Sequence, residues 1–289
     1  MIRKAVIPAA GFGTRFLPFT KSVPKEMIPL VDKPVIQYVI EEAVASGITD
    51  ILVVISSGKN AIQDHFNPDP GLMARLEANA KAELLEELRG IDRIANLHYV
   101  YQQELKGLGD AILQARGFVG GEPFAILLGD TVTTSPSRPV TAQLIDVYER
   151  NGGSVVALEE VPMEKTSRYG VIDGTATGEN VYKVRSFVEK PDPSEAPSNL
   201  VIASRYLFTP EIFDFLARTG KGKGGEIQLT DAMREMVKTY PMYGCRIDGR
   251  RHDIGNKLEF IKSTVEFALA RDEFRDDITA WLKAFTAKL

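Results

Sequence analysis

Short runs of consecutive apolar residues alternate with helical patterns through the first half of this chain. The apolar runs lie at residues 4–7, 51–55, 97–101 and 124–128, and residues 35–45 and 109–115 carry helical spacing. Strands that are apolar throughout are typical of a parallel sheet covered by helices on both faces. We therefore predict an α/β fold with a doubly wound, mostly parallel sheet, whose ligands bind at the carboxyl ends of the strands.

The second half of the chain continues with strand patterns and ends in helices. Further strands are predicted at 154–158, 181–188, 201–208 and 243–247, and the residues from 257 onward have helical spacing. We find no internal repeat, low-complexity tract or clear linker. The prediction is a single domain over residues 1–289 with a helical C-terminal extension over about 257–289.

Two stretches carry more apolar surface than a monomer comfortably leaves exposed. One is a stripe around Trp281 in the C-terminal extension. The other predicts one long amphipathic helix, because after two prolines an apolar residue recurs at every fourth position: Leu72, Leu76, Ala80, Leu84 and Leu88. We expect a homodimer or homotetramer that uses at least one of these stripes.

Composition excludes several classes of protein. The net charge of −4 provides no general field for nucleic acid or an anionic membrane. The single cysteine, Cys245, excludes an intrachain disulfide and indicates a reducing compartment. No run reaches the roughly 18 apolar residues of a membrane span, and no signal-peptide pattern precedes the first strand. We expect a cytoplasmic enzyme that does not bind nucleic acid or membrane.

A small, glycine-rich loop follows the first predicted strand. It reads Ala9-Ala10-Gly11-Phe12-Gly13-Thr14-Arg15, and Lys25 follows ten residues after its last member. Glycines allow backbone N–H groups to crowd around phosphate oxygens, Arg15 can bind two oxygens at once, and Lys25 supplies a mobile charge. The glycines alone fit an ordinary turn equally well, whereas the two cations favour a nucleoside triphosphate.

Two better-known phosphate loops are excluded. The dinucleotide fingerprint requires a third glycine, and position 16 is Phe. The Walker loop requires a Gly-Lys-Ser/Thr ending that this segment lacks. The loop is a different kind of nucleotide site.

Two carboxylates are candidates for holding Mg²⁺. Asp130 follows the strand at 124–128 beside the glycine-rich loop, and Asp253 lies in Arg251-His252-Asp253-Ile254-Gly255. Taken singly, Asp130 fits the cap of a helix or turn, which is the commoner role of an Asp after Gly, and Asp253 fits an Asx turn ahead of the C-terminal helix. Together with a phosphate loop they predict an octahedral site completed by phosphate oxygens and water.

Two further motifs carry polar groups that suit a sugar phosphate. Lys190, in Glu189-Lys190-Pro191, could neutralise a second phosphate, and Glu189 could accept hydrogen bonds from sugar hydroxyls. Glu226 lies where a glycine loop opens a predicted helix. Lys190 and Glu189 also fit solvated surface positions, and Glu226 also fits an acidic residue at the start of a helix. No covalent nucleophile is evident, so the predicted chemistry is positioning and charge neutralisation, as in phosphoryl-type transfer.

In this order the motifs resemble the sugar nucleotidyltransferase family, and within it the bacterial glucose-1-phosphate uridylyltransferases. The resemblance runs nearly end to end. Gly11-x-Gly13-Thr14-Arg15 marks the wider family only. Three motifs are far more specific to the uridylyl branch: Lys25-Glu26-Met27, Gly225-Glu226-Ile227-Gln228 and Asp253-Ile254-Gly255-Asn256-Lys257.

The resemblance implies a Rossmann-like sheet flanked by helices, of the nucleotide-diphospho-sugar transferase type. It also implies that UTP and glucose 1-phosphate give UDP-glucose and pyrophosphate with Mg²⁺. By matching positions, the resemblance implies that uracil is bound by Ala10, Gly11 and Gln102, with Gly107 and Gly109 nearby, and that the triphosphate is bound by Arg15 and Lys25. It implies that the metal is bound by Asp130 and Asp253. It implies that glucose is bound by Gly170, Glu189 and Glu226, and the sugar phosphate by Lys190.

One departure and two alternatives accompany this prediction. The family usually has a second acidic residue after the first metal-binding Asp, and this chain has Thr131 there. The near alternative is the same chemistry with another base or sugar, such as dTTP or galactose 1-phosphate. The distant alternative is a non-catalytic nucleotide-sugar sensor, which would not need both metal carboxylates and both lysines.

Overall fold

A nine-stranded sheet forms the centre of the molecule in a computed structural model, which describes residues 1–288. The strand order is β5-β4-β1-β6-β11-β8-β12-β10-β9. The strands are β1 (Lys4–Pro8), β4 (Asp50–Ile55), β5 (Asn96–Tyr101), β6 (Phe124–Leu127), β8 (Ser154–Glu160), β9 (Gly170–Gly178), β10 (Val181–Glu189), β11 (Leu200–Phe208) and β12 (Met242–Arg246). The predicted strands are confirmed to within two residues at each end, and β9 was not predicted.

The sheet is parallel in its first half and mixed in its second. Strands β5, β4, β1 and β6 are all parallel, whereas β11 runs antiparallel to both β6 and β8. Strand β12 is parallel to β8, and β10 and β9 follow as antiparallel strands. The predicted α/β sheet flanked by helices is confirmed.

Helices cover both faces of the sheet, and the alternation of side chains along each strand explains why. In β1, Ala5 and Ile7 pack with α1 (Val35–Ala45) and α2 (Asn60–Phe66), whereas Val6 packs toward the opposite face. On that face lie α5 (Leu108–Leu113), α6 (Arg116–Val119), α8 (Ile212–Arg218) and α9 (Leu229–Met236), and α7 (Val140–Asn151) packs against β8 and β11. Because both faces are covered, the central strands are apolar throughout.

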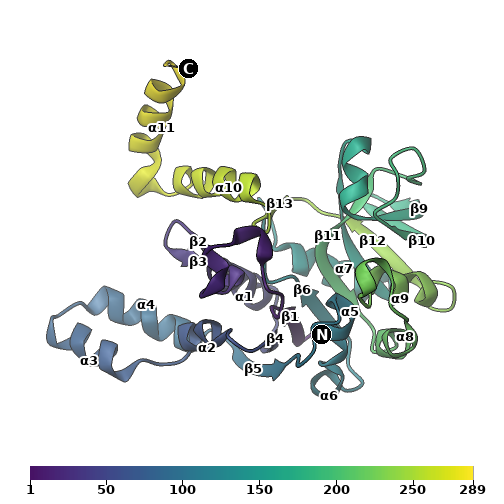
Figure 1. The fold of residues 1–289 in the computed structure, drawn as a ribbon, viewed down its shortest axis with the longest axis horizontal. Coiled ribbons are helices and arrows are strands. Elements are labelled where there is room, and N and C mark those ends of the chain that lie inside the picture. Colours follow the sequence, from purple (N-terminus) through teal and green to yellow (C-terminus); the bar gives the residue numbers. More distant parts are fainter. Residues whose placement is uncertain (289) are drawn as a thin grey trace.

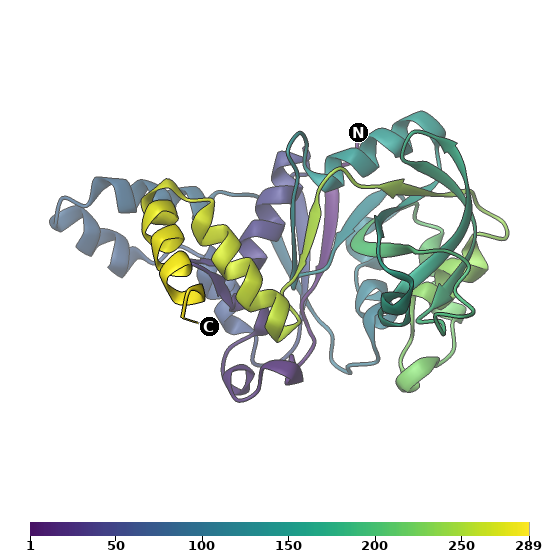
Figure 2. The ribbon, with the colours of Figure 1, turned by 90° about the horizontal axis from the view of Figure 1, so that it is seen from above.

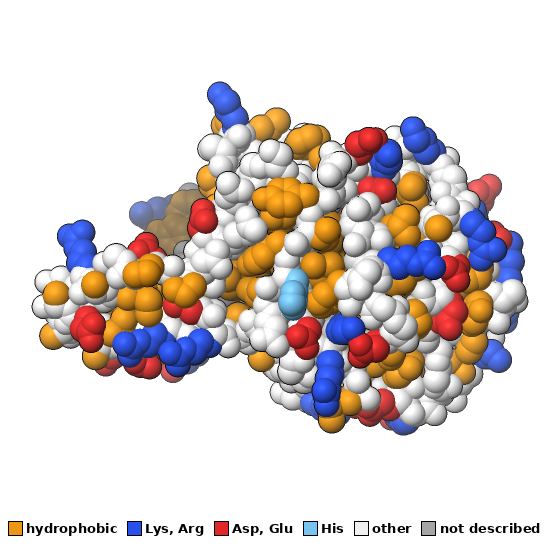
Figure 3. Space-filling model, turned by 90° about the horizontal axis from the view of Figure 1, so that it is seen from below, with side chains coloured by type: hydrophobic (Ala, Val, Ile, Leu, Met, Phe, Trp, Pro, Cys, Tyr) orange, Lys and Arg blue, Asp and Glu red, His pale blue; other side chains and the backbone are white. Residues whose placement is uncertain are grey.

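The predicted single helix through residues 72–88 is wrong. The segment forms two helices, α3 (Pro70–Ala78) and α4 (Ala82–Asp92), and Ala80 between them has φ 54. A left-handed residue cannot continue a right-handed helix, so the chain reverses there. Leu85 is buried, whereas Leu72 and Leu84 of the predicted stripe are 43% and 49% exposed. In Figure 3, apolar side chains are visible on the surface of this projecting helix pair.

The C-terminal extension is helical, as predicted. It consists of α10 (Lys257–Leu269) and α11 (Asp272–Thr286), which contact each other. Figures 1 and 2 show the α3–α4 and α10–α11 pairs projecting from the same end of the molecule, far from β9 and β10. Among residues 1–288, no helix is long and apolar enough to cross a membrane.

A small antiparallel ladder that was not predicted positions one of the candidate carboxylates. Strand β7 (Thr131–Thr134) pairs with β13 (Arg250–Asp253), and Thr131 lies opposite Asp253. The ladder therefore brings Asp253 beside the end of the segment that carries Asp130. A second short ladder joins β2 (Pro29–Leu30) to β3 (Lys33–Pro34).

Candidate active site

Two adjoining cavities form one cleft at the carboxyl edge of the parallel strands. The larger has a volume of about 470 Å³ and the smaller about 330 Å³. Four residues line both cavities: Leu108, Leu128, Asp130 and Glu226. The location is the one expected for ligands of a parallel sheet.

The glycine-rich loop packs directly over Lys25. Gly13 has φ 65, and a Cβ at this position would lie 2.9 Å from Cβ of Lys25, so a larger residue would be both strained and obstructed. Ala10 and Gly11 line the larger cavity, whereas Gly13 supports the loop from outside the cavity wall. Arg15 lies in the short 3₁₀ helix Thr14–Phe16 and is exposed.

Lys25 and Asp130 form an ion pair at the centre of the cleft. Burial favours the neutral form of Asp130, but the charge and hydrogen bond of Lys25, together with a backbone hydrogen bond and the charge of Arg15, hold the pKa of this carboxyl below its ordinary value. Burial likewise opposes the charge on Lys25, and the carboxylates of Asp130 and Glu26 together hold its pKa above the ordinary value. Both groups are therefore charged at neutral pH.

Asp253 approaches the same point from β13. A Cβ added to Gly255 would lie 3.1 Å from Oδ1 of Asp253 and 3.2 Å from Oδ2 of Asp130, so the two carboxylates converge on one small space. Burial, followed by the charge of Asp130, raises the pKa of Asp253 above its ordinary value. Two carboxylates that repel each other in this way favour a bound cation.

Gln102 lies on the wall of the larger cavity. It is 4% exposed, and its Nε2 donates to Oδ2 of Asp110 at 2.6 Å and to the carbonyl of Gly107 at 3.2 Å. These two bonds fix the orientation of the amide. Its carbonyl oxygen is therefore the group available to accept a hydrogen bond from a ligand.

Gly107 and Gly109 allow the segment that carries Glu226 to approach closely. A Cβ on Gly107 would lie 2.7 Å from Cβ of Glu226, and one on Gly109 would lie 2.7 Å from Cγ2 of Ile227. The backbone N–H of Gly109 donates to the carbonyl of Ile227 at 2.9 Å. Gly107 lines the larger cavity, whereas Gly109 lies beneath the docked segment and not on the wall.

The smaller cavity contains the predicted sugar-binding residues. Gly170, Glu189 and Lys190 line it together with Glu226. Oε2 of Glu189 accepts a hydrogen bond from Thr230 at 2.7 Å, and Oε1 lies 3.0 Å from Nζ of Lys190. Lys190 has φ 48, so the chain turns sharply where β10 ends. The structure thus brings the four residues together.

Sequence reasoning missed three residues that line the cleft or support it. Glu26 lines the larger cavity and is completely buried, and its partner Lys59 follows β4 at the same sheet edge. Arg251 lines the smaller cavity, where it lies 4.3 Å from the ring centre of Tyr169 and donates to Glu159 at 2.9 Å. A cation four residues after the predicted strand at 51–55 was the available signal for Lys59.

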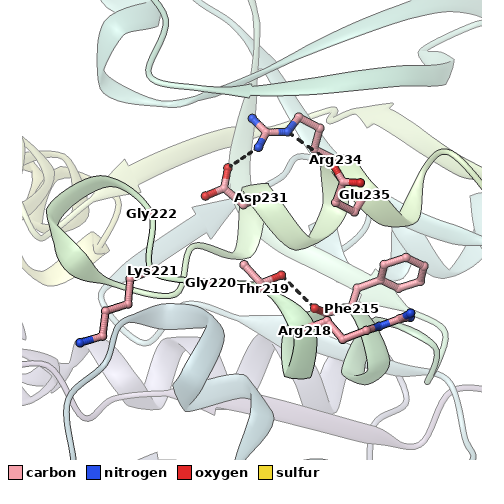
Figure 4. A pocket seen from close by; sticks show the side chains of 9 residues that line it. All are labelled: Phe215, Arg218, Thr219, Gly220, Lys221, Gly222, Asp231, Arg234 and Glu235. Carbon is pink, nitrogen blue, oxygen red and sulfur yellow. Dashed lines mark hydrogen bonds and ion pairs between the residues drawn. The ribbon is translucent and has the colours of Figure 1, made fainter.

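A separate hollow of about 560 Å³ lies beside α8 and α9 (Figure 4). Arg234 on its wall pairs with Asp231 at 3.2 Å, so opposite charges compensate each other there. Other wall residues are Phe215, Arg218, Lys221 and Glu235. None of the candidate site residues lies on this wall, and we assign the chemistry to the cleft.

The comparison with protein families decides the class of the chain, because the nucleotidyl transferase model matches residues 4–268. The chain belongs to the nucleotidyl transferase family. This nucleotidyl transferase is 48% identical over 287 residues to the UTP–glucose-1-phosphate uridylyltransferase of Bacillus subtilis (strain 168), covering 99% of this chain and 98% of the relative.

Solved structures agree with this assignment. A UTP-bound UGPase from Acinetobacter baumannii is 35% identical, with a TM-score of 0.91 over 98% of this nucleotidyl transferase and 99% of that chain. A UDP-glucose pyrophosphorylase complexed with UDP-glucose is 40% identical, with a TM-score of 0.87 over 94% of this chain and all of that one. The predicted family and fold are confirmed.

Proposed function

We propose that this chain transfers the uridylyl group of UTP to glucose 1-phosphate, giving UDP-glucose and pyrophosphate. The observation that carries the proposal is the single cleft. Gln102, a polar amide that can recognise a base, lines the larger cavity. Asp130, which pairs with Lys25, lines both cavities, and Glu189 and Lys190 line the smaller one. The near full-length similarity to uridylyltransferases supports the same activity.

In the proposed reaction, a phosphate oxygen of glucose 1-phosphate forms a bond to the α-phosphorus of UTP. The bond from that phosphorus to the bridging oxygen breaks, and pyrophosphate leaves with the electron pair. Lys190 holds the attacking phosphate, and Arg15 and Lys25 bind the triphosphate and stabilise the charge that develops on the leaving side. Glu189, Glu226 and Gly170 bind the glucose ring.

The chemistry of the donor set fits Mg²⁺. Among residues 1–288 no group of three or more His, Cys, Asp or Glu side chains is arranged to hold a metal. Asp130 and Asp253 nevertheless converge, and Mg²⁺ usually takes one or two carboxylates together with substrate phosphates and water. When bound there it would neutralise phosphate charge. The residues of the chain position the two substrates around it.

We also propose that the chain acts as one unit over residues 1–289, in the cytoplasm, as a homodimer or homotetramer. The apolar side chains of the two projecting helix pairs support the assembly. The rings of Trp281 and Phe285 on α11 are stacked, with 5.4 Å between their centroids, and the two residues are 54% and 49% exposed. Leu258 and Ile261 on α10 are also exposed. Covering such side chains in a subunit contact removes them from water.

The experiment that tests the activity measures pyrophosphate release across a panel of nucleoside triphosphates and sugar 1-phosphates. The proposal expects the highest kcat/KM with UTP and glucose 1-phosphate. A preference for dTTP or galactose 1-phosphate would assign the chain to another substrate pair. Binding of UDP-glucose without any turnover would instead indicate a nucleotide-sugar sensor.

A further inference from the structure

A buried ion pair outside the cleft holds the segment that carries Asp130. Arg205 on β11 is completely buried, and its Nε and Nη2 lie 3.0 Å and 2.7 Å from Oε2 of Glu42 on α1. Neither residue of the pair lies on the wall of the larger or the smaller cavity. Apolar side chains of similar size often stabilise a protein core as well as a buried ion pair does, so stability alone does not explain this pair.

The guanidinium of Arg205 holds the backbone on both sides of Asp130. Its Nη1 donates to the carbonyl of Ser204 at 3.1 Å, and that carbonyl also accepts from the backbone N–H of Leu128 at 3.2 Å, two residues before Asp130. Its Nη2 donates to the carbonyl of Thr131 at 2.8 Å, directly after Asp130. One rigid, planar group therefore fixes both ends of the short segment that presents a predicted metal ligand.

The backbone of β11 is irregular at this point. Ser204 has φ 60, and the pairing of β11 with β8 changes register between Ile202 and Tyr206. A positive φ is uncommon and costly for a residue other than glycine, and such irregularities re-aim side chains beside active sites. Here Ser204 lines the smaller cavity while the adjacent Arg205 lies in the buried pair.

Glu42 holds the same region through a second set of bonds. Its Oε2 accepts from the hydroxyl of Thr133 on β7 at 2.6 Å, and its Oε1 accepts from the hydroxyl and the backbone N–H of Thr141 on α7 at 2.7 Å and 3.1 Å. Strand β7 is the one that pairs with β13 and places Thr131 opposite Asp253. The pair is therefore bonded to the strand that joins the two converging carboxylates.

We propose that Arg205 and Glu42 are positioning residues for the metal site, which hold β7 so that Asp130 and Asp253 converge. The proposal rests on the uridylyl-transfer function above, in which Mg²⁺ binds between these carboxylates. Mg²⁺ demands nearly ideal octahedral geometry, so a small displacement of a ligand lowers its affinity. Loss of residues that orient metal ligands typically lowers metal affinity by about 10–100-fold.

The test measures the binding of UTP with and without Mg²⁺ by titration calorimetry, so it does not depend on turnover. The ratio of the two dissociation constants gives the contribution of the metal. For the wild type we expect UTP to bind about 10-fold or more tightly when Mg²⁺ is present. Variants that disturb only the positioning of the carboxylates should lower this ratio and leave the binding of UTP without Mg²⁺ unchanged.

Two matched variants separate positioning from stability. Thr133→Val and Thr141→Val each remove one hydroxyl hydrogen bond to the Glu42 carboxylate, and urea denaturation should show similar losses of stability. Thr133 lies on β7, so Thr133→Val should lower the ratio by about threefold or more. Thr141→Val leaves Oε1 with the backbone N–H of Thr141 and with Nε of Arg205, so its ratio should stay within about 1.5-fold of the wild type.

A third variant tests the guanidinium itself. In Arg205→Lys the ammonium can still pair with Glu42, but it cannot also reach the carbonyls of Ser204 and Thr131, because it lacks the planar fork of arginine. This variant should bring the ratio to within about twofold of one. If Arg205→Lys does not fold, the comparison of the two threonine variants decides the question.

The proposal is overturned if Thr133→Val and Thr141→Val change the ratio equally, or if Thr133→Val keeps the wild-type ratio while losing stability, since the pair would then be a structural element only. It is also overturned if Mg²⁺ does not change the binding of UTP to the wild type. Failure of the proposed function is a separate result, because it would be seen as absence of pyrophosphate release from UTP and glucose 1-phosphate while UTP still binds.

Discussion

The ammonium of Lys25 donates a hydrogen bond to Oδ2 of Asp130, which joins the glycine-rich loop region to the end of β6. The pair links a group predicted to bind phosphate with a group predicted to bind the metal. Each partner stabilises the charge of the other in a cleft where burial opposes both charges. A change to either residue is therefore expected to affect the other.

The first prediction concerns Asp130. Asp130→Asn should reduce turnover to near background, because a neutral amide binds Mg²⁺ poorly and no longer balances Lys25. Steady-state kinetics at saturating Mg²⁺ measures this, and circular dichroism should show an unchanged fold. Asp173→Asn, on an exposed pair with Arg185, is the control. Near wild-type turnover in Asp130→Asn would remove Asp130 from the metal site.

The second prediction concerns Lys190. Lys190→Ala should raise KM for glucose 1-phosphate more than KM for UTP, because it removes a charge-assisted contact worth on the order of 1.5–3 kcal/mol from one substrate only. Initial rates with each substrate varied in turn measure the two constants. Lys183→Ala, on the same strand β10, should leave both unchanged. An equal effect on the two substrates would contradict the proposed role of Lys190.

The third prediction concerns the order of nucleotides. We expect kcat/KM with glucose 1-phosphate to fall in the order UTP, dTTP, CTP and then the purines. The carbonyl of Gln102 suits the N–H of uracil or thymine, whereas cytosine has an acceptor at that position, at a cost of about 1–3 kcal/mol or more. A preference for dTTP over UTP would move the chain to the thymidylyl branch of the family.

The fourth prediction concerns assembly. Light scattering at micromolar concentration should show a dimer or tetramer, because the exposed apolar side chains on α3–α4 and α10–α11 require a partner surface. Trp281→Glu and Leu84→Glu test the two helix pairs separately, and at least one of them should shift the mass toward the monomer. Lys283→Glu is a charge control on α11. A wild-type monomer would refute the prediction.

The fifth prediction concerns stability and pH. Nη2 of the buried Arg205 lies 2.7 Å from Oε2 of Glu42, a carboxylate that also accepts from Thr133 and Thr141. Burial opposes the charge of Glu42, but Arg205 and these hydrogen bonds hold its pKa below the ordinary value. The stabilisation from this carboxylate is thus fully present at pH values above its ordinary pKa, near 4.5. It is lost as the pH falls through the lowered pKa.

Arg205→Met leaves this carboxylate buried without its cation, and should lower the free energy of unfolding at pH 7 by about 3–5 kcal/mol. The difference in the free energy of unfolding between this variant and the wild type should shrink as pH falls. Burial without the cation raises the pKa of Glu42, and the neutral acid costs less free energy to bury than the carboxylate. Urea denaturation across pH 4–8 measures both effects, and Arg185→Met, on an exposed pair, should show a much smaller change. A loss of unfolding free energy that does not depend on pH would contradict the assignment of this stabilisation to the Arg205–Glu42 pair.

Local patterns in the sequence determined the strands and the first loop. The continuous apolar runs predicted β1, β4, β5 and β6 because strands covered on both faces must be apolar at every position. Gly11, Gly13 and Lys25 predicted the phosphate-binding region because their spacing is short and their chemistry is local. The resemblance to the family extended these predictions to Gln102, Gly107, Gly109 and Gly170.

Tertiary structure decided what depends on contacts between distant segments. The β7–β13 ladder places Asp253 beside Asp130, and its strands have too few apolar residues to be read from periodicity. The turn at Ala80 depends on a single backbone conformation, which the four-residue spacing of leucines cannot reveal. The Glu26–Lys59 pair joins two loops that meet at one edge of the sheet. The sequence could not predict this pair, because the burial of Glu26 and the lack of a partner for its Oε1 among residues 1–288 depend on how the loops pack.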